Sequence, residues 1–501
     1  MIKLIDKEIY IIKMLTKSDY LLGLQCPKLL WNKKHNFVNF PKVSDVDKAK
    51  FKEGDLIGEF AKKLFPEGID LSQEGFKDNL SKTKELLEKR VPLFEAGFLV
   101  NDLFSRADIL VPTGDNKWDI IEVKSATKVK DVNIHDVSFQ KKVYEDFGIK
   151  IRNCFIMHVN NEYVKDGTLD LNDFFVKTDI TEKVEEFALD IEKRIENMLK
   201  IINSKEEPKC SIGVHCSDPY DCALTGECWN DVPDGSVFEF YRMFKKKCFE
   251  LYHSGIVKIG DVPDSVKLND KQKIQRLIAE KGGKHIDNKQ IKFFLGNLKY
   301  PIYYLDFETI NPAIPKFNGM KPYQRIPFQF SLHIQDKPNG ELKHISFLAD
   351  GIDDPKPKFL QALKDNLGDK GDILVYNQSF EKGVMNECVN TFSGYFEWYE
   401  DNIQPRIKDL WDVFRNFWYY CADQKGSASI KCVLPALSDL KYDNLEIKKG
   451  DVASYEWERI TFLEKVSDEE KEKIRKALEE YCELDTLAEV KIVEALREVL
   501  K

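Results

Sequence analysis

Two acidic side chains at the end of one short apolar run are the residues of this sequence best suited to chemistry. Residues 302–305 are apolar and aromatic, which is typical of a buried strand. Because side chains alternate along a strand, Asp306 and Glu308 share one face and Phe307 takes the other. Neighbouring carboxylates repel each other unless a cation lies between them. The pair therefore indicates either a metal site or a strand end whose acids point into solvent.

Further acids follow two other predicted elements downstream. Residues 372–376 form a second apolar run, and Glu381 comes shortly after it. Near the end of the chain, Ser467 and Glu470 make a capping box that predicts a long amphipathic helix over residues 468–500. Tyr481 and Asp485 lie four residues apart in that helix and so share one face.

The strand-end DxE, the Glu after a second strand and the helical YxxxD resemble the DEDD exonuclease family, which has an RNase H-like fold. By this resemblance two Mg²⁺ or Mn²⁺ ions are held by Asp306, Glu308, Glu381 and Asp485. Tyr481 would orient the attacking water, and Asp409 stands where the family often carries a structural acid. The family usually has Asp where this chain has Glu381.

A second set of polar residues surrounds a predicted hairpin in the first half of the chain. Residues 107–111 and 118–123 are the expected strands, with a turn-rich loop between them. Asp108 lies on the first strand, and Glu122 and Lys124 lie two residues apart on one face of the second. Gln140 and Tyr144 follow at i, i+4 spacing on a predicted helix.

This order of Asp, ExK and QxxxY resembles the PD-(D/E)XK nucleases of the RecB type. The resemblance implies that Asp108 and Glu122 ligate Mg²⁺ and that Lys124 positions or activates the water. Gln140 and Tyr144 would support the site and contact DNA. The family often has a His on its first helix, where this sequence offers Glu59. Residues 149–159 are expected to form a further strand, and residues 179–202 one amphipathic helix.

Four cysteines recur every six residues in a Gly- and Pro-containing stretch: Cys210, Cys216, Cys222 and Cys228. Such density indicates metal binding rather than core packing. Zinc would prefer paired spacings of two to four residues, whereas the spacing of iron–sulfur ligands is more variable. A zinc site made of these four cysteines remains one interpretation.

The other interpretation rests on a resemblance to RecB-like nucleases of the AddB type and of CRISPR adaptation. They carry one Cys before the nuclease core and three after it, and the four hold a [4Fe–4S] cluster. Cys26, in LGLQCPKLLW, matches the early ligand, and Cys216, Cys222 and Cys228 match the later three. Cys210 is then a spare or an alternative ligand.

The composition is typical of a large globular protein and predicts no membrane-spanning segment. The chain has 501 residues, of which 43% are hydrophobic, and no apolar run approaches the roughly 20 residues of a membrane span. Eleven cysteines without a secretory signal favour reduced thiols or metal ligation, so we expect a cytoplasmic protein. The net charge is −9, but residues 232–300 hold 14 Lys and Arg against 8 Asp and Glu. That stretch could follow a phosphate backbone or be a solvated helical linker.

The sequence as a whole predicts an α/β multidomain protein. It resembles a prokaryotic family of unknown function that joins a RecB-like iron–sulfur nuclease to an RNase H-like exonuclease. The expected parts are a PD-(D/E)XK restriction-endonuclease-like domain over 1–231, a basic helical connector over 232–300 and an RNase H-like domain over 301–501.

The expected function is a metal-dependent nuclease with two active sites. It would act on single-stranded DNA or DNA ends, in repair or in defence against mobile elements, with DNA preferred over RNA. The alternative is a non-catalytic, nucleic-acid-binding iron–sulfur scaffold in which one or both sites have decayed.

Overall fold

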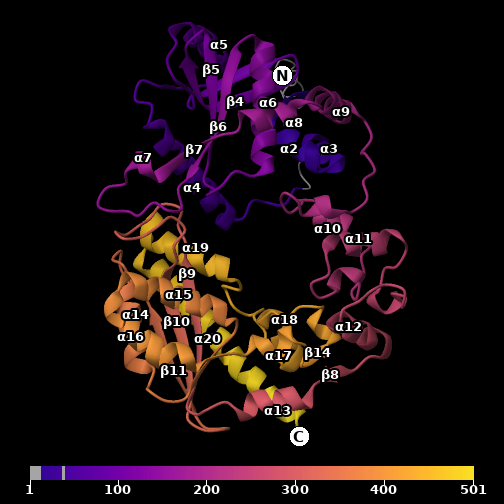
Figure 1. Ribbon diagram of the computed structural model, residues 1–501, viewed down its shortest axis with the longest axis vertical. Helices are drawn as coiled ribbons and strands as arrows, with labels where there is room; N and C mark the ends of the chain where they lie inside the picture. The colour runs from indigo at the N-terminus through magenta and orange to yellow at the C-terminus, as the bar shows by residue number, and fades with distance from the viewer. Residues whose placement is uncertain (1–12, 36–39) are drawn as a thin grey trace. The chain divides into compact units, whose positions relative to one another are not determined.

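The computed structural model describes residues 13–35 and 40–501, which form two compact units (Figure 1). The first unit comprises the described part of Met1–Asp231 together with Ala313–Pro322. The second comprises Val232–Pro312 and Tyr323–Lys501. Each unit combines a mixed sheet with many helices, so the prediction of a multidomain α/β protein is confirmed. Residues 232–300, expected as a separate connector, fall within the second unit.

Within the described residues, a seven-stranded mixed sheet is the framework of the first unit. Its strands are β1 (Leu15–Thr16), β2 (Ile69–Asp70), β3 (Leu93–Val100), β4 (Leu103–Thr113), β5 (Lys117–Lys124), β6 (Lys150–Val159) and β7 (Phe175–Asp179). The order is β2-β3-β4-β5-β6-β7, and β1 pairs with β4. The predicted hairpin is β4–β5, an antiparallel pair, and β6 lies parallel to β5.

The helices of the first unit surround this sheet. They are α2 (Lys17–Gln25), α3 (Pro27–His35), α4 (Asp45–Lys62), α5 (Phe76–Leu86), α6 (Asp131–Phe147), α7 (Leu171–Phe174), α8 (Thr181–Ala188), α9 (Ile191–Asn203) and α10 (Thr225–Cys228). Helix α6 connects the parallel strands β5 and β6 and packs on β3, β4 and β6. The side chain of Thr16 caps α2, and Cys26 with Pro27 separates α2 from α3.

The single helix expected over residues 179–202 is wrong, because the segment contains two helices, α8 and α9. The chain turns at Leu189 and Asp190, and the Leu189 side chain is exposed to solvent. Arg194 Nη1 donates to the carbonyl of Phe187 at 3.0 Å. This bond satisfies a carbonyl that the end of α8 leaves without an intrahelical partner.

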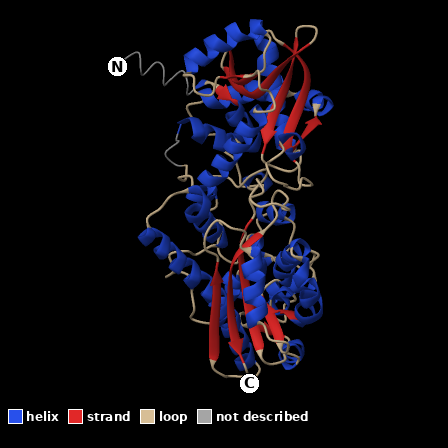
Figure 2. Cartoon of the chain, turned by 90° about the vertical axis from the view of Figure 1, so that its left-hand side faces the viewer, coloured by secondary structure: helices blue, strands red, loops and turns tan. Residues whose placement is uncertain are grey.

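A five-stranded mixed sheet organises the second unit, within the part of the chain that is described (Figure 2). Its strands are β9 (Ile302–Ile310), β10 (Ile326–Gln335), β11 (Leu342–Leu348), β12 (Asp372–Val375) and β13 (Ile407–Asp409). The order is β11-β10-β9-β12-β13. Strands β9, β10 and β11 are antiparallel, whereas β12 and β13 run parallel to β9. A small antiparallel pair joins β8 (Lys284–Ile286) to β14 (Tyr419–Cys421).

Ten helices are described for the second unit: α11 (Lys245–His253), α12 (Asp270–Lys281), α13 (Asn288–Gly296), α14 (Lys356–Asn366), α15 (Gln378–Thr391), α16 (Phe396–Trp398), α17 (Trp411–Arg415), α18 (Ile430–Leu437), α19 (Gly450–Glu458) and α20 (Asp468–Val499). The long helix α20 begins after Ser467, whose side chain accepts from the Glu470 amide as the capping pattern predicts. It packs on β9, β10 and β11, while side chains of α14 and α15 join the apolar core around Phe307.

Among the described residues, we find no helix that combines the length and the apolar character needed to cross a membrane.

Candidate functional site

The first acidic cluster lies in the second unit, where β9 meets α20. Strand alternation directs Phe307 into the core beside α14 and α15, and so turns Asp306 and Glu308 toward α20. Asp485, on α20, completes a group in which one oxygen of each carboxylate lies within 4.8 Å of the others. Glu308 is 9% exposed and Asp485 is 8% exposed. Three of the four acids that were predicted to share a site are thus brought together, largely shielded from water.

Burial and mutual repulsion act together on these carboxyl groups. Burial, and then the charge of Asp485, raises the pKa of Asp306 well above its usual range. Burial and then Asp306 raise the pKa of Glu308 in the same way. Burial raises the pKa of Asp485 to about 6. A cation beside the group would favour the ionised form of all three.

Tyr481 lies one helical turn before Asp485 and is buried beside this cluster. Its hydroxyl accepts a hydrogen bond from Lys431 Nζ at 3.1 Å. A Cβ atom built at Gly450 would lie 3.6 Å from the Glu308 oxygens and 3.8 Å from the Tyr481 hydroxyl. The lack of a side chain at Gly450 therefore leaves room beside both groups. Lys431, near the start of α18, was missed because a single Lys in an apolar helix carries no local signal.

Two further side chains hold the acids in place. The Tyr442 hydroxyl donates to Asp485 Oδ1 at 2.6 Å. The Cys482 thiol lies 3.8 Å from Asp306 Oδ2, to which it donates. Burial, and then the charge of Asp485, raises the pKa of Tyr442, so its hydroxyl stays protonated and available as a donor. These bonds orient two of the carboxylates before any ion binds.

Glu381, the predicted fourth ligand, lies in the first turn of α15 and is 2% exposed. It is not one of the three carboxylates that lie within 4.8 Å of one another. Among the described residues its Oε2 has no hydrogen-bond partner. Burial, and then the charge of Asp306, raises its pKa well above the usual range. Glu381 therefore lies outside the close group of three, but near enough for the charge of Asp306 to act on its carboxyl group.

Glu489 is a buried carboxylate of this region that the sequence analysis did not identify. It lies four residues after Asp485 on α20 and is 1% exposed. Its Oε2 has no partner in residues 13–35 and 40–501. Burial, and then the charges of Asp306 and Glu381, raises its pKa. The i, i+4 repeat of Tyr481, Asp485 and Glu489 was the signal available in the sequence.

Asp409, at the end of β13, has a different role. Its Oδ1 accepts from the backbone amides of Asn377 and Trp411, each at 3.0 Å. The side chain thereby ties the start of α15 to the start of α17. This agrees with the structural role that the family resemblance implied.

A cavity of about 500 Å³ opens beside the starts of α15, α17 and α18. Its lining combines aromatic, amide and guanidinium groups with a small-residue loop: Tyr241, Arg242, Tyr376, Asn377, Trp411 and residues 426–430. The Arg242 guanidinium lies 5.4 Å from the centre of the Tyr241 ring and 6.0 Å from that of Trp411. Aromatic faces and guanidinium groups are the side chains on which nucleobases stack.

The second acidic cluster lies at the β4–β5 hairpin of the first unit. Glu122 and Lys124 share one face of β5, and Lys124 Nζ lies 2.6 Å from Glu122 Oε1. Asp108, on β4, accepts from the backbone amide of Val123 at 2.9 Å. The three residues of the predicted Asp and ExK pattern therefore meet on one side of the hairpin.

Two charged residues that the sequence analysis missed complete this cluster. Lys17 Nζ, from α2, lies 3.1 Å from Glu122 Oε1 and 3.4 Å from Asp108 Oδ1. Asp136, from α6, lies 3.0 Å from Lys124 Nζ. A Lys in the first turn of one helix and an Asp in the first half of another are common, so neither residue carries a local signal.

The pKa values of the two carboxyl groups, those of Glu122 and Asp108, are shifted in opposite directions. Burial by itself would raise the pKa of Glu122, but Lys124 and Lys17 hold it well below its usual range. Burial and then Glu122 raise the pKa of Asp108 to about 7, against the opposing effect of Lys17. The pKa of Lys124 is raised by Glu122 and Asp136 although burial opposes this. The ammonium groups therefore remain charged and balance the acids.

Gln140 and Tyr144 reach the same cluster from α6. Gln140 Nε2 donates to Glu122 Oε2 at 2.6 Å, and the Tyr144 hydroxyl donates to Gln140 Oε1 at 3.1 Å. Both residues are 0% exposed. Gln140 orients Glu122 through its hydrogen bond, and Tyr144 in turn orients Gln140. Contact of these residues with DNA stays a prediction. Glu59 instead forms an ion pair with Lys62 on α4, at 2.6 Å.

The cysteines gather in one apolar pocket of the first unit. Cys26, at the junction of α2 and α3, packs with Cys210, Cys222, Cys228 and the buried Leu224. Cys216 also lies near, since its thiol raises the pKa of Cys222 together with burial and with the Cys26 and Cys228 thiols. The early cysteine predicted from the family resemblance is therefore beside the later ones.

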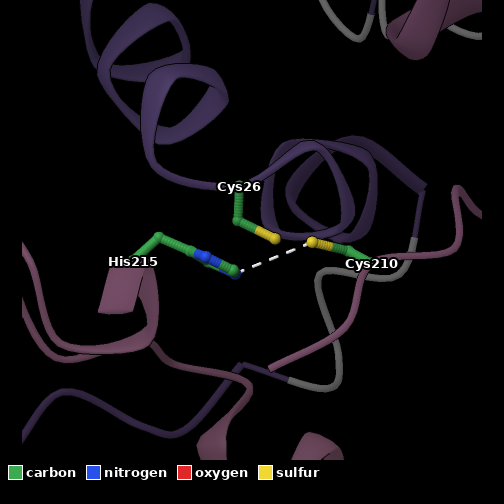
Figure 3. Close-up of side chains that lie close together, drawn as sticks. All are labelled: Cys26, Cys210 and His215. Atoms are coloured by element: carbon green, nitrogen blue, oxygen red, sulfur yellow. Dashed lines mark hydrogen bonds between the residues drawn. The ribbon is translucent and has the colours of Figure 1, made fainter. Parts of the chain in front are cut away.

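Cys210, the predicted spare or alternative ligand, lies in this group too. One ligand atom each of Cys26, Cys210 and His215 lies within 4.8 Å of the others. Figure 3 shows the two sulfur atoms directed toward each other, with the imidazole facing them, and Cys210 Sγ lies 3.6 Å from His215 Nε2. His215 was not predicted, although its position directly before Cys216 was the available signal.

Comparison with known proteins gives a family-model match to part of the chain and three similar proteins. A family model described as a domain of unknown function, DUF2779, matches residues 303–429. That segment contains Asp306, Glu308, Glu381 and Asp409 but ends before Asp485.

The chain is also similar to three bacterial proteins. The Uncharacterized protein MG366 homolog of Mycoplasma pneumoniae is 28% identical over 260 residues, which are 48% of this chain and 38% of that protein. Uncharacterized protein MG366 of Mycoplasma genitalium is 28% identical over 242 residues, 43% of this chain and 36% of that protein. Uncharacterized protein UU173 of Ureaplasma parvum is 27% identical over 234 residues, 41% and 33% of the two chains. The matched part of the chain thus spans about a third of the length of these relatives.

Proposed function

We propose that this chain is a metal-dependent nuclease with two active sites that hydrolyses phosphodiester bonds in DNA. The observation that carries the proposal is the convergence of Asp306, Glu308 and Asp485 within 4.8 Å, next to the Tyr481 hydroxyl. Oxygen ligands from several carboxylates suit Mg²⁺ and Mn²⁺, and such ions promote attack on phosphate esters.

The chemistry of the donors fits such ions in the second unit. All the donors are carboxylate oxygens, and Asp306 is partly exposed whereas Glu308, Glu381, Asp485 and Glu489 are buried. Glu381 Oε2 and Glu489 Oε2 have no partner among the described residues. Burial and then the charge of Asp306 raise the pKa values of Glu381 and Glu489, and Glu381 also raises that of Glu489. A neighbouring cation would stabilise the ionised form of both carboxyl groups. Bound as a pair, the ions would stabilise the attacking and the leaving oxygen of the phosphodiester.

The side chains of this chain would then have separate roles. Asp306, Glu308 and Asp485 would hold the ions, and Glu381 would supply the fourth carboxylate. Glu489, behind them on α20, would add negative charge to the site. Tyr481, held by Lys431, would orient the attacking water through its hydroxyl.

The cavity beside α15 supports a nucleic-acid strand as the substrate. Tyr241 and Trp411 offer aromatic faces, and Arg242 offers a positive charge close to both. Stacking of a base on such groups tolerates every sequence and requires an unpaired base. We therefore propose single-stranded DNA or DNA ends as the substrate of this unit.

The sheet order supports an RNase H-like fold for the second unit. The three antiparallel strands β11, β10 and β9 are neighbours, and two strands that run parallel to β9, first β12 and then β13, follow on the free side of β9. In the first unit, the β4–β5 hairpin followed by α6 and the parallel strand β6 supports a PD-(D/E)XK fold. Asp306 and Glu308 lie within β9, which continues to Ile310, so the expectation that they follow the end of a strand is wrong. In the first unit Asp108 lies within β4 and Glu122 lies near the end of β5.

In the first unit, Asp108 and Glu122 would hold Mg²⁺ and Lys124 would stabilise negative charge on the phosphate. Lys17 makes ion pairs with both proposed ligands. An ion that binds there must displace the Lys17 ammonium or share the carboxylates with it. The non-catalytic alternative therefore applies more to this cluster than to that of the second unit.

The cysteine group would hold a [4Fe–4S] cluster through Cys26, Cys216, Cys222 and Cys228. The donor set fits, since Cys26, Cys222 and Cys228 share one apolar, partly buried cluster and the Cys216 thiol lies close enough to act on the pKa of Cys222. Anaerobically purified protein should be brown, with broad absorbance near ~400 nm. Cys216→Ala should bleach it, whereas Cys210→Ala should not. Stoichiometric zinc without iron or sulfide would replace this assignment by a zinc site, for which His215 offers a nitrogen ligand.

The function itself is tested with end-labelled single- and double-stranded DNA and RNA, in Mg²⁺, Mn²⁺ or chelator. We expect degradation of single-stranded DNA that depends on the added ion. Binding without degradation of any of the four substrates under all conditions would favour the scaffold alternative.

A further inference from the structure

A second group of metal-binding side chains lies beside α20, outside the acidic cluster of the second unit. One ring nitrogen of His333, one of His344 and one carboxylate oxygen of Glu483 lie within 4.8 Å of one another. The two histidines face each other because β10 and β11 pair with His333 opposite His344. Their rings stack with centres 4.6 Å apart, and α20 brings Glu483 to them.

Both imidazole rings are held in orientation by hydroxyl groups. Nδ1 of His333 lies 2.8 Å from Thr486 Oγ1, and Nε2 of His344 lies 3.0 Å from Ser331 Oγ. The two hydroxyl oxygens are themselves 2.6 Å apart. A histidine that ligates a metal almost always uses its other ring nitrogen in such a hydrogen bond. This network therefore orients both rings and leaves one nitrogen of each for an ion.

We propose that His333, His344 and Glu483 form a binding site for zinc or a similar divalent transition ion. Two imidazole nitrogens and one carboxylate are a recognised zinc ligand set, with a fourth position left for water. His344 Nδ1 and Glu483 Oε1 are 3.7 Å apart. Ligands at the usual 2.0–2.1 Å from a tetrahedral zinc are about 3.3 Å apart, so a small side-chain movement suffices.

Solvent can reach the site, since the side chains of His344 and Glu483 are 26% and 46% exposed. His333 is 4% exposed and forms the inner wall. A bound ion would join the β10–β11 hairpin to α20 two residues before Asp485. The proposal is independent of nuclease activity, and its test measures ion binding alone.

The test is a Zn²⁺ titration of metal-stripped, full-length protein against a chromophoric chelator. His344→Ala should bind one zinc fewer than the parent, whereas His285→Ala, on β8, should bind the parental number. Titration with Co²⁺ separates this site from the cysteines, because only the thiolate-bound ion shows sulfur charge-transfer bands. Those bands should be unchanged in His344→Ala. Equal zinc stoichiometry and affinity in the parent and His344→Ala would overturn the proposal.

Glu483→Gln should fold as the parent does, because the Glu483 side chain is about half exposed. We expect zinc affinity at this site to fall at least tenfold. Glu479→Gln, one turn earlier on α20, is the matched control and should bind as the parent does. Thr486→Val removes the hydroxyl that holds His333 and should weaken zinc about 10- to 100-fold. If neither Glu483→Gln nor Thr486→Val changes the affinity, the site does not exist.

Discussion

At the β4–β5 hairpin, two lysine ammonium groups lie within 3.4 Å of the carboxylates of Asp108 and Glu122. At the junction of β9 and α20, by contrast, the acids face mainly one another, and the Lys431 ammonium hydrogen-bonds to the Tyr481 hydroxyl. Glu122, Glu308 and Asp485 are buried, whereas Asp108 and Asp306 are partly exposed, so water separates the charges of each cluster only in part. The first cluster obtains its positive charge from side chains, whereas in our proposal the second would obtain it from ions.

The difference shows in the pKa values of the acids. In the first cluster Glu122 is kept ionised by Lys124 and Lys17, although burial opposes this. In the second, burial and neighbouring acids raise the pKa values of Asp306, Glu308 and Glu489 together. The charge of Lys431 opposes these shifts only in part, so the second cluster should bind divalent ions more tightly and depend on them more strongly than the first. The five predictions that follow test this contrast.

The largest effect is expected for Asp306→Asn. The substitution keeps the side-chain shape and removes one charge from the centre of the second cluster. Since bound ions contribute several kcal/mol to such reactions, hydrolysis by this unit should fall at least about 10³-fold. The rate is measured on labelled single-stranded DNA in a Lys124→Ala background, with Asp336→Asn as an exposed control. A parental rate in Asp306→Asn would remove this cluster from the reaction.

Lys124→Ala tests the first cluster, in an Asp306→Asn background that silences the second. Cleavage should slow about 10²-fold, because Lys124 would stabilise negative charge in the transition state. DNA binding, followed by fluorescence anisotropy, should be retained. Lys128→Ala, an exposed lysine after the same strand, is the control. No residual cleavage in the Asp306→Asn background itself would mean that the first cluster is not catalytic.

Lys17→Gln removes one positive charge from the first cluster, so the charge balance of its acids should become more like that of the second cluster. Without this ammonium group, Asp108 and Glu122 lose a countercharge that an ion can replace, so Mg²⁺ should bind at least about tenfold more tightly. Calorimetric titration of Mg²⁺ into the Asp306→Asn protein, with and without Lys17→Gln, measures the change. Equal affinities would show that Lys17 does not compete with the ion.

Glu381→Asp and Glu489→Gln examine the edge of the second cluster. Mg²⁺ requires near-octahedral geometry, and Glu381 is outside the close group of three carboxylates. Activity should therefore be several-fold stronger with Mn²⁺ than with Mg²⁺, and Glu381→Asp should narrow that gap. Glu489→Gln should lower both activities equally. If Glu381→Ala changes neither activity, Glu381 is not a ligand.

The smallest effect is a dependence of stability on pH in the absence of added ions. The carboxyl groups of the second cluster have raised pKa values in the folded state, with that of Asp485 at about 6. The folded protein then binds more protons than the unfolded chain, whose acids titrate near pH 4, so stability falls as pH rises above about 4. We expect Tm to fall by a few degrees between pH 5 and pH 8, and Mn²⁺ to restore it most at pH 8. In Asp306→Asn the ion should restore less. If Tm rises over this range, or if Mn²⁺ leaves it unchanged, the acids of the second cluster do not have raised pKa values that an ion relieves.

Local spacing in the sequence determined which acids share an element and a face. The alternation of a strand placed Asp306 with Glu308, and the turn of a helix placed Tyr481 with Asp485, because these repeats follow from backbone geometry alone. The β4–β5 hairpin and the start of α20 after Ser467 were predictable too, because turn and capping residues act on the backbone next to them.

Partners from distant elements were decided by the tertiary structure. Lys17 meets Glu122 across 105 positions of the chain, and no repeat or capping pattern links them. Glu489 shares a face of α20 with Tyr481 and Asp485 by its spacing, but its burial depends on what packs against that face. His333 and His344 meet because the register of β10 and β11 sets them opposite each other. Short-range geometry is written into neighbouring residues, whereas the charge balance of a buried site depends on which surfaces pack together.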